Sequence, residues 1–265
     1  MIVDSHIHSI MSPDGKVTPE DAIAAASSQG LGVTFTEHID YISPPFSPMW
    51  RIQFPYQYKD FVTNLDIYPD IYYPYRSDTA LLGLEIGLSA GFIEKNMKAA
   101  ERAIDCIIGA VHFVDGWDLG GPYYDQPYDD HYRRYLQFIR EMVEEPLNGY
   151  FNTLGHIDYL SRYSPLAIKE VLYKDYPDEY DAVLRALVRL DKAMEINTRR
   201  FGDVDAVSNL CEIYRRYRTL GGRYVTIGSD AHAKDRIGKH FKEALRMAAE
   251  LGLTAVYFKD RKMKS

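Results

Sequence analysis

The chain has 265 residues, of which 46% are hydrophobic and 26% are charged, and these values are ordinary for a globular protein with a sizeable core. Its 31 Lys and Arg residues against 38 Asp and Glu residues give a formal net charge of −7. This acidic balance argues against a broad surface for nucleic acids or anionic membranes, because either surface requires clustered positive charge.

The chain start and the cysteines indicate a cytoplasmic protein. The first residues, Met1-Ile-Val-Asp-Ser-His6, lack the basic and apolar regions of a signal peptide. No apolar run approaches the roughly 20 residues that a membrane-spanning helix needs. Cys106 and Cys211 lie far apart without metal-ribbon spacing, so we expect two reduced thiols.

Short apolar or β-branched runs alternate with amphipathic segments along the chain. The runs expected to form strands cover residues 1–5, 32–36, 80–86, 106–113, 150–155, 193–197 and 224–228, with a tail strand at 254–258. The first helix is expected from Thr18, a capping residue followed by Pro19, to Gly30. Further helices are expected near residues 92–103, 129–145, 177–190, 205–220 and 238–251.

Residues 42–77 interrupt this alternation with many Pro and Tyr residues. Here we expect a loop followed by one helix over residues 56–73. The aromatic side chains either cap a pocket or belong to the core.

Strands that alternate with helices predict parallel βαβ units. The seven principal runs favour an α/β fold with a distorted seven-stranded (β/α)₇ TIM-like barrel over an open sheet. There is no linker-like shift in composition and no internal repeat, so residues 1–265 are expected to form a single domain.

Histidines and carboxylates stand where these predicted strands end, and barrel enzymes place their chemistry at that end. These residues are His6, His8, His38, Glu85, His112, His156, Asp230 and His232. Residues i and i+2 of a strand point to the same side, so both imidazoles of His6-Ile-His8 can reach one metal ion. Asp4 shares that side and either orients an imidazole or is an ordinary polar residue.

Each of these residues has a structural alternative when it is taken alone, but the alternatives do not explain why all of them mark equivalent strand ends. Glu85 follows an apolar run, where an unpaired carboxylate is costly, so metal ions are the favoured partners. By contrast, His131 and His240 fall inside predicted helices and are expected on the surface. The set therefore predicts shared metal binding.

The motifs that hold these residues resemble the PHP (polymerase and histidinol phosphatase) family and run in order along nearly the whole chain. They are Asp4-Ser-His6-Ile-His8, Pro13-Asp14-Gly15, Glu37-His38, Gly83-Leu-Glu85, Gly109-Ala-Val-His112, Gly155-His156-Ile-Asp158 and Gly228-Ser-Asp230-Ala-His232. Val111–Trp117 and His156–Tyr163 are similar to the histidinol-phosphatase branch. The resemblance implies hydrolysis of L-histidinol phosphate in histidine biosynthesis, and a distorted seven-stranded barrel.

The resemblance also implies three divalent metal ions. One would be held by His6, His8, Glu85 and Asp230. A second would be held by Asp14, His38 and His232. A third would be held by His112 and His156, with Glu85 as the bridge. Many family members have histidine at the position of Asp14, which leaves zinc, iron and manganese as candidates.

This chemistry suits a phosphate monoester, a small dianion that repels hydroxide and has a poor leaving group. Neighbouring metal ions supply a bridging hydroxide at neutral pH and hold the phosphoryl oxygens. Arg162 and Arg199 are candidates to clamp the phosphoryl group or are surface ion-pair partners. Asp230 is a candidate proton donor as well as a ligand.

Two other functions remain open from the sequence. A phosphoesterase of the same family for nucleotides or bisphosphates would favour more cationic residues than the pairs Arg199-Arg200 and Arg215-Arg216. A non-catalytic, metal-stabilised binding module is opposed by the presence of every expected ligand type.

Overall fold

One curled, largely parallel sheet organises the residues that the computed structural model describes, which are 1–41 and 61–265. The hydrogen-bonded path runs β1-β2-β4-β5-β8-β9-β10-β11, and β3 pairs antiparallel with β2. The path strands are Val3–Ile7, Gly32–Asp40, Ala80–Gly87, Cys106–Ala110, Thr153–Leu154, Ala193–Asn197, Tyr224–Gly228 and Thr254–Ala255. Eight strands stand on this path, so the expected count of seven is not confirmed. The difference arises because the start of the tail run pairs with β10 and extends the sheet.

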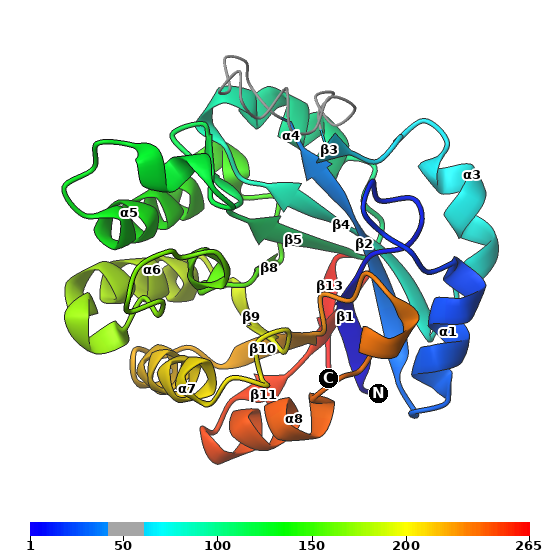
Figure 1. The fold of residues 1–265 in the computed structure, drawn as a ribbon. Helices are drawn as coiled ribbons and strands as arrows, with labels where there is room; N and C mark the ends of the chain where they lie inside the picture. The colour runs from blue at the N-terminus through cyan, green and yellow to red at the C-terminus, as the bar shows by residue number, and fades with distance from the viewer. Residues whose placement is uncertain (42–60) are drawn as a thin grey trace.

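The sheet curls until the segment after β10 returns to β1 (Figure 1). Ile7 and Ala231 form an isolated parallel β-bridge. The His8 N–H donates to the Ala231 carbonyl at 2.8 Å, and the Asp230 N–H donates to the His6 carbonyl at 2.8 Å. These bonds bring the ligand candidates of the first and last principal strands side by side.

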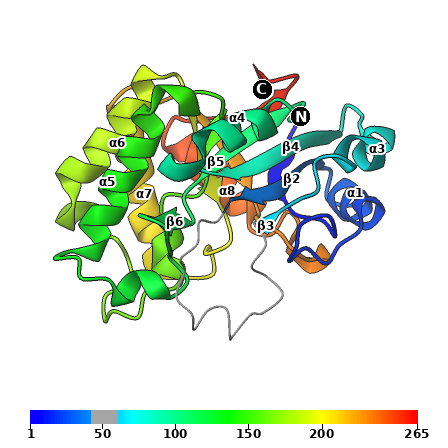
Figure 2. The same cartoon turned by 90° about the horizontal axis from the view of Figure 1, so that it is seen from above.

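Helices cover the outside of the sheet (Figures 1 and 2). They are α1 (Pro19–Ser27), α3 (Tyr68–Tyr72), α4 (Ile93–Ala100), α5 (His131–Glu144), α6 (Pro177–Arg189), α7 (Val204–Thr219) and α8 (Phe241–Glu250). The predicted cap of α1 is confirmed, because the Thr18 hydroxyl accepts from the Asp21 N–H at 3.2 Å and Pro19 opens the helix. Short 3₁₀ turns cover Tyr73–Tyr75, Ala90–Phe92, Pro122–Asp125, Pro146–Asn148, Tyr159–Arg162, Tyr173–Asp175 and Lys234–Arg236.

The interior strands are buried on both faces. All nine residues of β2 and all eight of β4 are buried, as expected where helices cover one side of a parallel sheet and the curled interior fills the other. The buried side chains form one main apolar cluster, which runs from Ile7 in β1 through the helices to Leu253. The strand ends are therefore held on a packed framework.

The helix predicted over residues 56–73 is wrong in its described part. Residues 61–79 hold the two-residue strand β3 (Phe61–Val62) and the five-residue α3, while residues 42–60 lie outside the described residues. Pro69 fits the first turn of α3, whereas Pro74 lies in the following 3₁₀ turn and cannot continue an α-helix. Whether residues 42–60 cap a pocket stays a prediction.

Two hairpins were also not predicted as such. One is β6 (Phe113–Val114) with β7 (Trp117–Asp118), and the other is β12 (Tyr257–Lys259) with β13 (Lys262–Lys264). The predicted strand 106–113 therefore ends at Ala110, and its last residue belongs to the first hairpin.

Asp105 ties the C-terminal hairpin to the sheet and should be important for stability. Its carboxylate accepts from Arg76 Nη2 at 2.6 Å, from the Leu82 N–H at 2.9 Å and from the Asp260 N–H at 2.9 Å. Asp105→Ala should lower the free energy of unfolding by about 2–3 kcal/mol, because it leaves two N–H groups without their acceptor and Arg76 with only Asp260 as a carboxylate partner. Denaturant titration of both proteins measures this difference.

The matched control is Asp78→Ala, whose side chain is 91% exposed and pairs with Lys259 at the surface. It should leave the unfolding midpoint nearly unchanged. Burial raises the pKa of Asp105, but Arg76 and the backbone N–H groups outweigh burial and lower it below the ordinary 3.8. The stabilisation is therefore fully present above that value and is lost as the pH falls below it. Equal losses in the two variants would contradict this account.

None of the helices within residues 1–41 and 61–265 has the length and apolar character needed to cross a lipid bilayer.

Candidate metal centre

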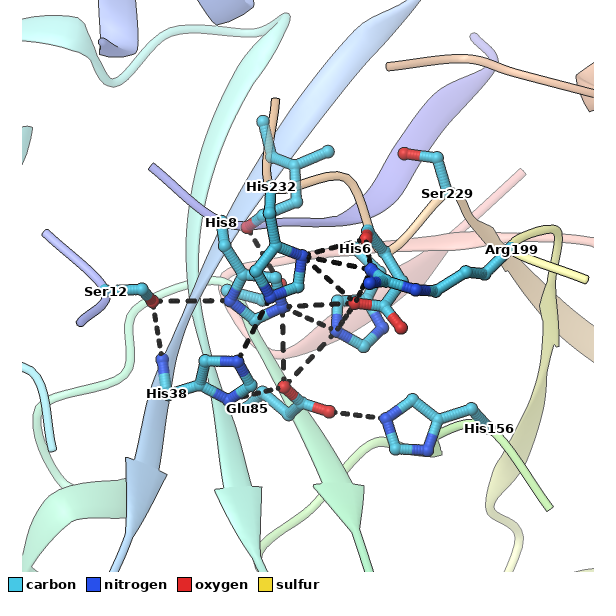
Figure 3. Close-up of polar contacts among 12 residues, drawn as sticks. His6, His8, Ser12, His38, Glu85, His156, Arg199, Ser229 and His232 are labelled. Atoms are coloured by element: carbon cyan, nitrogen blue, oxygen red, sulfur yellow. Dashed lines mark hydrogen bonds and ion pairs between the residues drawn. The ribbon is translucent and has the colours of Figure 1, made fainter. Parts of the chain in front are cut away.

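The predicted ligands come together at the carboxyl ends of the strands (Figure 3). Four groups of side chains have ligand atoms within 4.8 Å of one another, and each group is able to hold a metal ion. The groups are His6, His8 and Asp230; His8, His38 and His232; His6, Glu85 and His156; and His38, Asp40 and His112. Their overlap makes one continuous cluster with room for several ions.

Glu85 lies at the centre of this cluster, at the end of β4. Its Oε1 atom lies 2.6 Å from His156 Nε2 and 3.3 Å from His112 Nε2. Its Oε2 atom lies 2.9 Å from His38 Nδ1. The Nε2 atoms of His6 and His8 each lie 3.4 Å from the same oxygen. One carboxylate thus faces five imidazoles, which is the position that a bridging ligand requires.

Imidazole nitrogens also face one another in pairs. The Nε2–Nε2 distances are 3.0 Å for His6 and His8, 3.4 Å for His112 and His156, and 3.5 Å for His38 and His232. Two nitrogen ligands at about 2.05 Å from a tetrahedral zinc ion would be about 3.4 Å apart. The pair spacings therefore fit nitrogen ligands that share a cation.

The electrostatics of the cluster also demand cations. Burial lowers the pKa of His6, but the negative charges of Glu195, Glu85 and Asp230 outweigh burial and raise it well above its ordinary value. The same balance, with Glu85 and Asp40 as the anions, raises the pKa of His38 to about 10. Without metal, protons supply the positive charge that the buried carboxylates require. Divalent ions are able to supply it instead, so the donor set fits them.

Buried acids that the sequence analysis missed orient the imidazoles. Asp40 Oδ1 lies 2.9 Å from His112 Nδ1, and Glu195 Oε1 lies 2.7 Å from His6 Nδ1. Each contact occupies the ring nitrogen that faces away from the cluster centre and leaves Nε2 free for a metal. Both acids had a signal in the sequence, because Asp40 shares a strand side with His38 and Glu195 lies inside an apolar strand, as Glu85 does.

Hydrogen bonds behind the cluster hold the loop after β1 in position. Glu37 is buried and accepts hydrogen bonds from Ser12 Oγ at 2.6 Å and from the hydroxyl of Tyr72 in α3. Ser12 Oγ in turn lies 3.3 Å from His8 Nδ1. Part of the Tyr-rich segment therefore packs behind the cluster as a support, which is the core role that aromatic residues commonly have.

Asp4 does not orient an imidazole. Its carboxylate accepts from the N–H and hydroxyl of Ser229, at 2.9 and 2.6 Å, and from the Gly238 N–H at 2.9 Å. It fixes the loop that carries Asp230 and His232. In that loop Asp230 has a φ of 52°, a left-handed conformation that costs a non-glycine residue about 1–3 kcal/mol and is found at functional sites.

Asp14 reaches the cluster from the loop between β1 and α1. Its Oδ2 atom lies 2.8 Å from His232 Nε2, and its Oδ1 atom lies 3.7 Å from His38 Nε2. Burial raises the pKa of Asp14, but His232 and His38 outweigh burial and lower it to about 2. Asp14 is thus an ionised oxygen donor beside two imidazoles.

Arg162 and Arg199 lie on the pocket wall beside Asp230. Arg162 Nη1 donates to Asp230 Oδ2 at 2.7 Å, and its guanidinium stacks 4.9 Å from the Tyr159 ring centroid. Only 9% of the Arg162 side chain is exposed, so its ion pair with Asp230 is buried and does not lie on the surface. Arg199 is 43% exposed and donates from Nη1 to the Asp230 carbonyl at 2.8 Å.

Both arginines and all of the cluster except the fully buried His6 and His8 line one open pocket. Its remaining wall is formed by Phe113, Asp118, Tyr159 and Tyr163. The pocket therefore combines metal ligands and cations with aromatic surface and one further carboxylate.

His131 and His240 are not brought to the cluster, but neither is a simple surface residue. His131 is half-buried at the start of α5, with its ring 5.3 Å from that of Tyr123. His240 precedes α8 in a left-handed conformation with a φ of 60°. The helical pattern did not show that both stand at helix starts, where a side chain packs against the preceding loop.

The fold and the cluster together define an α/β metal-binding protein whose site lies at the ends of parallel strands. The chain belongs to the PHP family, because the PHP domain model matches residues 4–199. It is 38% identical over 267 residues to a probable histidinol-phosphatase of Clostridium acetobutylicum, covering 100% of this chain and 99% of that protein. It is 29% identical to the histidinol-phosphatase of Lactococcus lactis, covering 88% of this chain and 85% of that protein.

Solved structures share this fold. The histidinol phosphate phosphatase of Lactococcus lactis, complexed with zinc, L-histidinol and phosphate, superposes with a TM-score of 0.86 at 26% identity, covering 100% of this chain and 99% of that one. A putative histidinol phosphatase of Listeria monocytogenes shares the fold, with a TM-score of 0.67 at 15% identity and coverage of 91% and 99%.

Proposed function

We propose that this protein hydrolyses L-histidinol phosphate to L-histidinol and phosphate in histidine biosynthesis. The observation that carries the proposal is the position of Glu85 among five imidazoles, with Arg162 and Arg199 on the same pocket wall. The similarity to histidinol-phosphatases over the full length of the chain supports this substrate above other phosphate esters.

The proposed ligands are the nine residues of the cluster that were expected from sequence. His6, His8, Glu85 and Asp230 would hold one ion. Asp14, His38 and His232 would hold another. Glu85 would bridge to a third ion held by His112 and His156. Zinc, iron and manganese all suit these nitrogen and oxygen donors, and zinc is the ion in the Lactococcus lactis complex. When bound, such ions supply a nucleophilic hydroxide at neutral pH and neutralise phosphoryl charge.

The residues of the chain position the ester around that chemistry. Arg162 is held in place by Asp230 and Tyr159, so its guanidinium is pre-oriented to contact a phosphoryl oxygen. Arg199, which is more exposed, would contact a second oxygen. In the reaction a P–O bond to hydroxide forms, the ester P–O bond breaks and the alcohol leaves with a proton. Burial raises the pKa of Asp230, but Arg162 and His6 outweigh burial and hold it well below the ordinary value. We therefore assign Asp230 as the candidate group that would take the proton lost by the attacking water and pass it to the leaving alcohol, besides its role as a ligand.

Four further points belong to this proposal. We infer that the seven path strands from β1 to β10 act as the distorted seven-stranded TIM-like barrel of the family, since the segment after β10 bonds to β1. We infer one domain over residues 1–265 and a cytoplasmic location with reduced cysteines. The net charge of −7 opposes nucleic acid as a partner.

A panel of phosphate monoesters tests the substrate. Metal-reconstituted protein should release phosphate from L-histidinol phosphate with a kcat/KM at least about tenfold above that for a nucleoside monophosphate or a sugar bisphosphate, because each well-placed contact to the alcohol part adds about tenfold. A higher value for a nucleotide or bisphosphate would favour the other phosphoesterase. Metal binding without release of phosphate from any ester would favour the non-catalytic module.

A further inference from the structure

The pocket carries one carboxylate that the proposed metal centre and reaction do not use. It belongs to Asp118 in the β6–β7 hairpin, which follows the strand that leads to His112. Phe113 and Asp118 are directly opposite each other in the hairpin register, so their side chains lie on the same face. Both line the pocket, so an aromatic ring and a carboxylate lie beside each other in its lining.

The sequence makes this hairpin rigid. Its turn is Asp115-Gly116 with φ values of 51° and 85°, the positive pair that a two-residue turn of the favoured twist requires. Arg134 of α5 holds the turn through Nη2 to Asp115 Oδ1 at 2.6 Å and Nε to Asp115 Oδ2 at 2.7 Å. The Leu119 N–H donates to the His112 carbonyl at 3.1 Å, which ties Asp118 to the metal centre.

Asp118 differs from the other acids of the pocket in its partners. Asp14, Asp40, Glu85 and Asp230 each lie within 4.0 Å of an imidazole or guanidinium nitrogen. Within the described part of the chain, Asp118 has no such cation and accepts only from the Gly120 N–H, at 2.6 Å. Burial raises the pKa of Asp118, with the Gly120 N–H and the charge of His112 acting against it. A half-buried carboxylate of this kind would gain from a cation supplied by a ligand.

We propose that Asp118 binds the ammonium group of the substrate alcohol and thereby selects phosphate esters of amino alcohols. This inference rests on the proposed function, since L-histidinol phosphate carries an ammonium on the carbon next to the ester methylene. In this proposal the phosphoryl group contacts the metal ligands and Arg162, and the ammonium contacts Asp118, which lines the same pocket. Tyr159 and Tyr163, with ring centroids 5.4 Å apart, offer apolar surface for the rest of the molecule.

The test compares two esters that differ only in the amine, L-histidinol phosphate and 3-(imidazol-4-yl)propyl phosphate. The ratio of their kcat/KM values measures selection of the ammonium. In Asp118→Asn this ratio should fall about 10- to 100-fold, the size expected for one hydrogen bond to a charged group. Calorimetry with L-histidinol in the presence of inorganic phosphate should show weaker binding of L-histidinol by a similar factor.

Asp125→Asn is the matched control, since Asp125 is exposed and lies in the same segment between β5 and α5. Its ratio should equal that of the parent protein. Asp118→Glu keeps the charge and should keep most of the selection, which separates charge from damage to the hairpin. Thermal unfolding and metal content of each variant show whether the fold is intact.

Two results would overturn the inference. One is an unchanged ratio in Asp118→Asn, and the other is an equal loss on both esters, which would assign Asp118 to the chemistry or the fold. A parent protein without activity on L-histidinol phosphate would contradict the proposed function separately. In that case the ratio of kcat/KM values is measured for 2-aminoethyl phosphate over ethyl phosphate. Asp118→Asn must still reduce this ratio.

Discussion

Glu85→Ala should lose metal and activity together. The carboxylate lies between five imidazoles. In the proposed centre it is a ligand of two ions, so its removal takes one ligand from each of them. We expect metal content to fall by at least one ion per chain. We also expect kcat/KM for L-histidinol phosphate to fall by at least about 10³-fold, more than the loss of a single stabilising donor. Elemental analysis and steady-state kinetics on the same preparation measure both effects.

Three variants serve as controls for this result. Glu94→Gln changes an exposed acid at the start of α4. His131→Ala and His240→Ala remove imidazoles that lie outside the cluster. All three should keep native metal content and activity, although His131→Ala should lose some stability because its ring packs against Tyr123. Full metal occupancy in Glu85→Ala would contradict the bridging role, and loss of metal in either histidine variant would extend the site beyond the nine residues.

Arg162→Ala should lose activity but keep its metal ions. The guanidinium is proposed to contact a phosphoryl oxygen in a sheltered pocket, so its removal should cost about 3–4 kcal/mol of transition-state stabilisation. That cost corresponds to roughly 10²- to 10³-fold in kcat/KM. Metal content should stay near that of the parent protein, because the cluster ligands remain. The measurement pairs kcat/KM for L-histidinol phosphate with elemental analysis.

Arg162→Lys keeps the charge without the planar fork and should fall between the parent protein and Arg162→Ala. Arg140→Ala, on the exposed face of α5, should have no effect. Near-native kcat/KM in Arg162→Ala would show that the guanidinium only pairs with Asp230. Loss of metal in the same variant would show instead that Arg162 acts by holding Asp230 in place.

The ligands were predictable because a strand has a period of two residues and because parallel strands end at one edge of a sheet. His6 and His8 on one strand, and Glu85 at the end of an apolar run, could be placed without a structure. The buried acids behind them were harder to assign, since Asp40 and Glu195 look like ordinary strand residues until the imidazoles that they contact are known.

Strand pairings and turn residues that the hydrophobic pattern does not capture explain where the predicted elements differ from the structure. The aromatic residues near α3 suggested one long helix, but Phe61 and Val62 pair with β2 and the helix begins only at Tyr68. The run to Phe113 suggested one strand, but Asp115-Gly116 folds it into a hairpin, and that pair is a turn signal that the sequence itself contains. The eighth strand of the path is a short pairing of Thr254 and Ala255 with β10, which a pattern of seven strong runs does not reveal.

The metal content of the native protein tests the central claim most directly. Protein purified without chelator and reconstituted with zinc, iron or manganese is analysed by mass spectrometry for metal per folded chain. The overlapping ligand groups around Glu85 predict about three ions per chain. A reproducible content of about one ion or less, unchanged by reconstitution, would contradict the account.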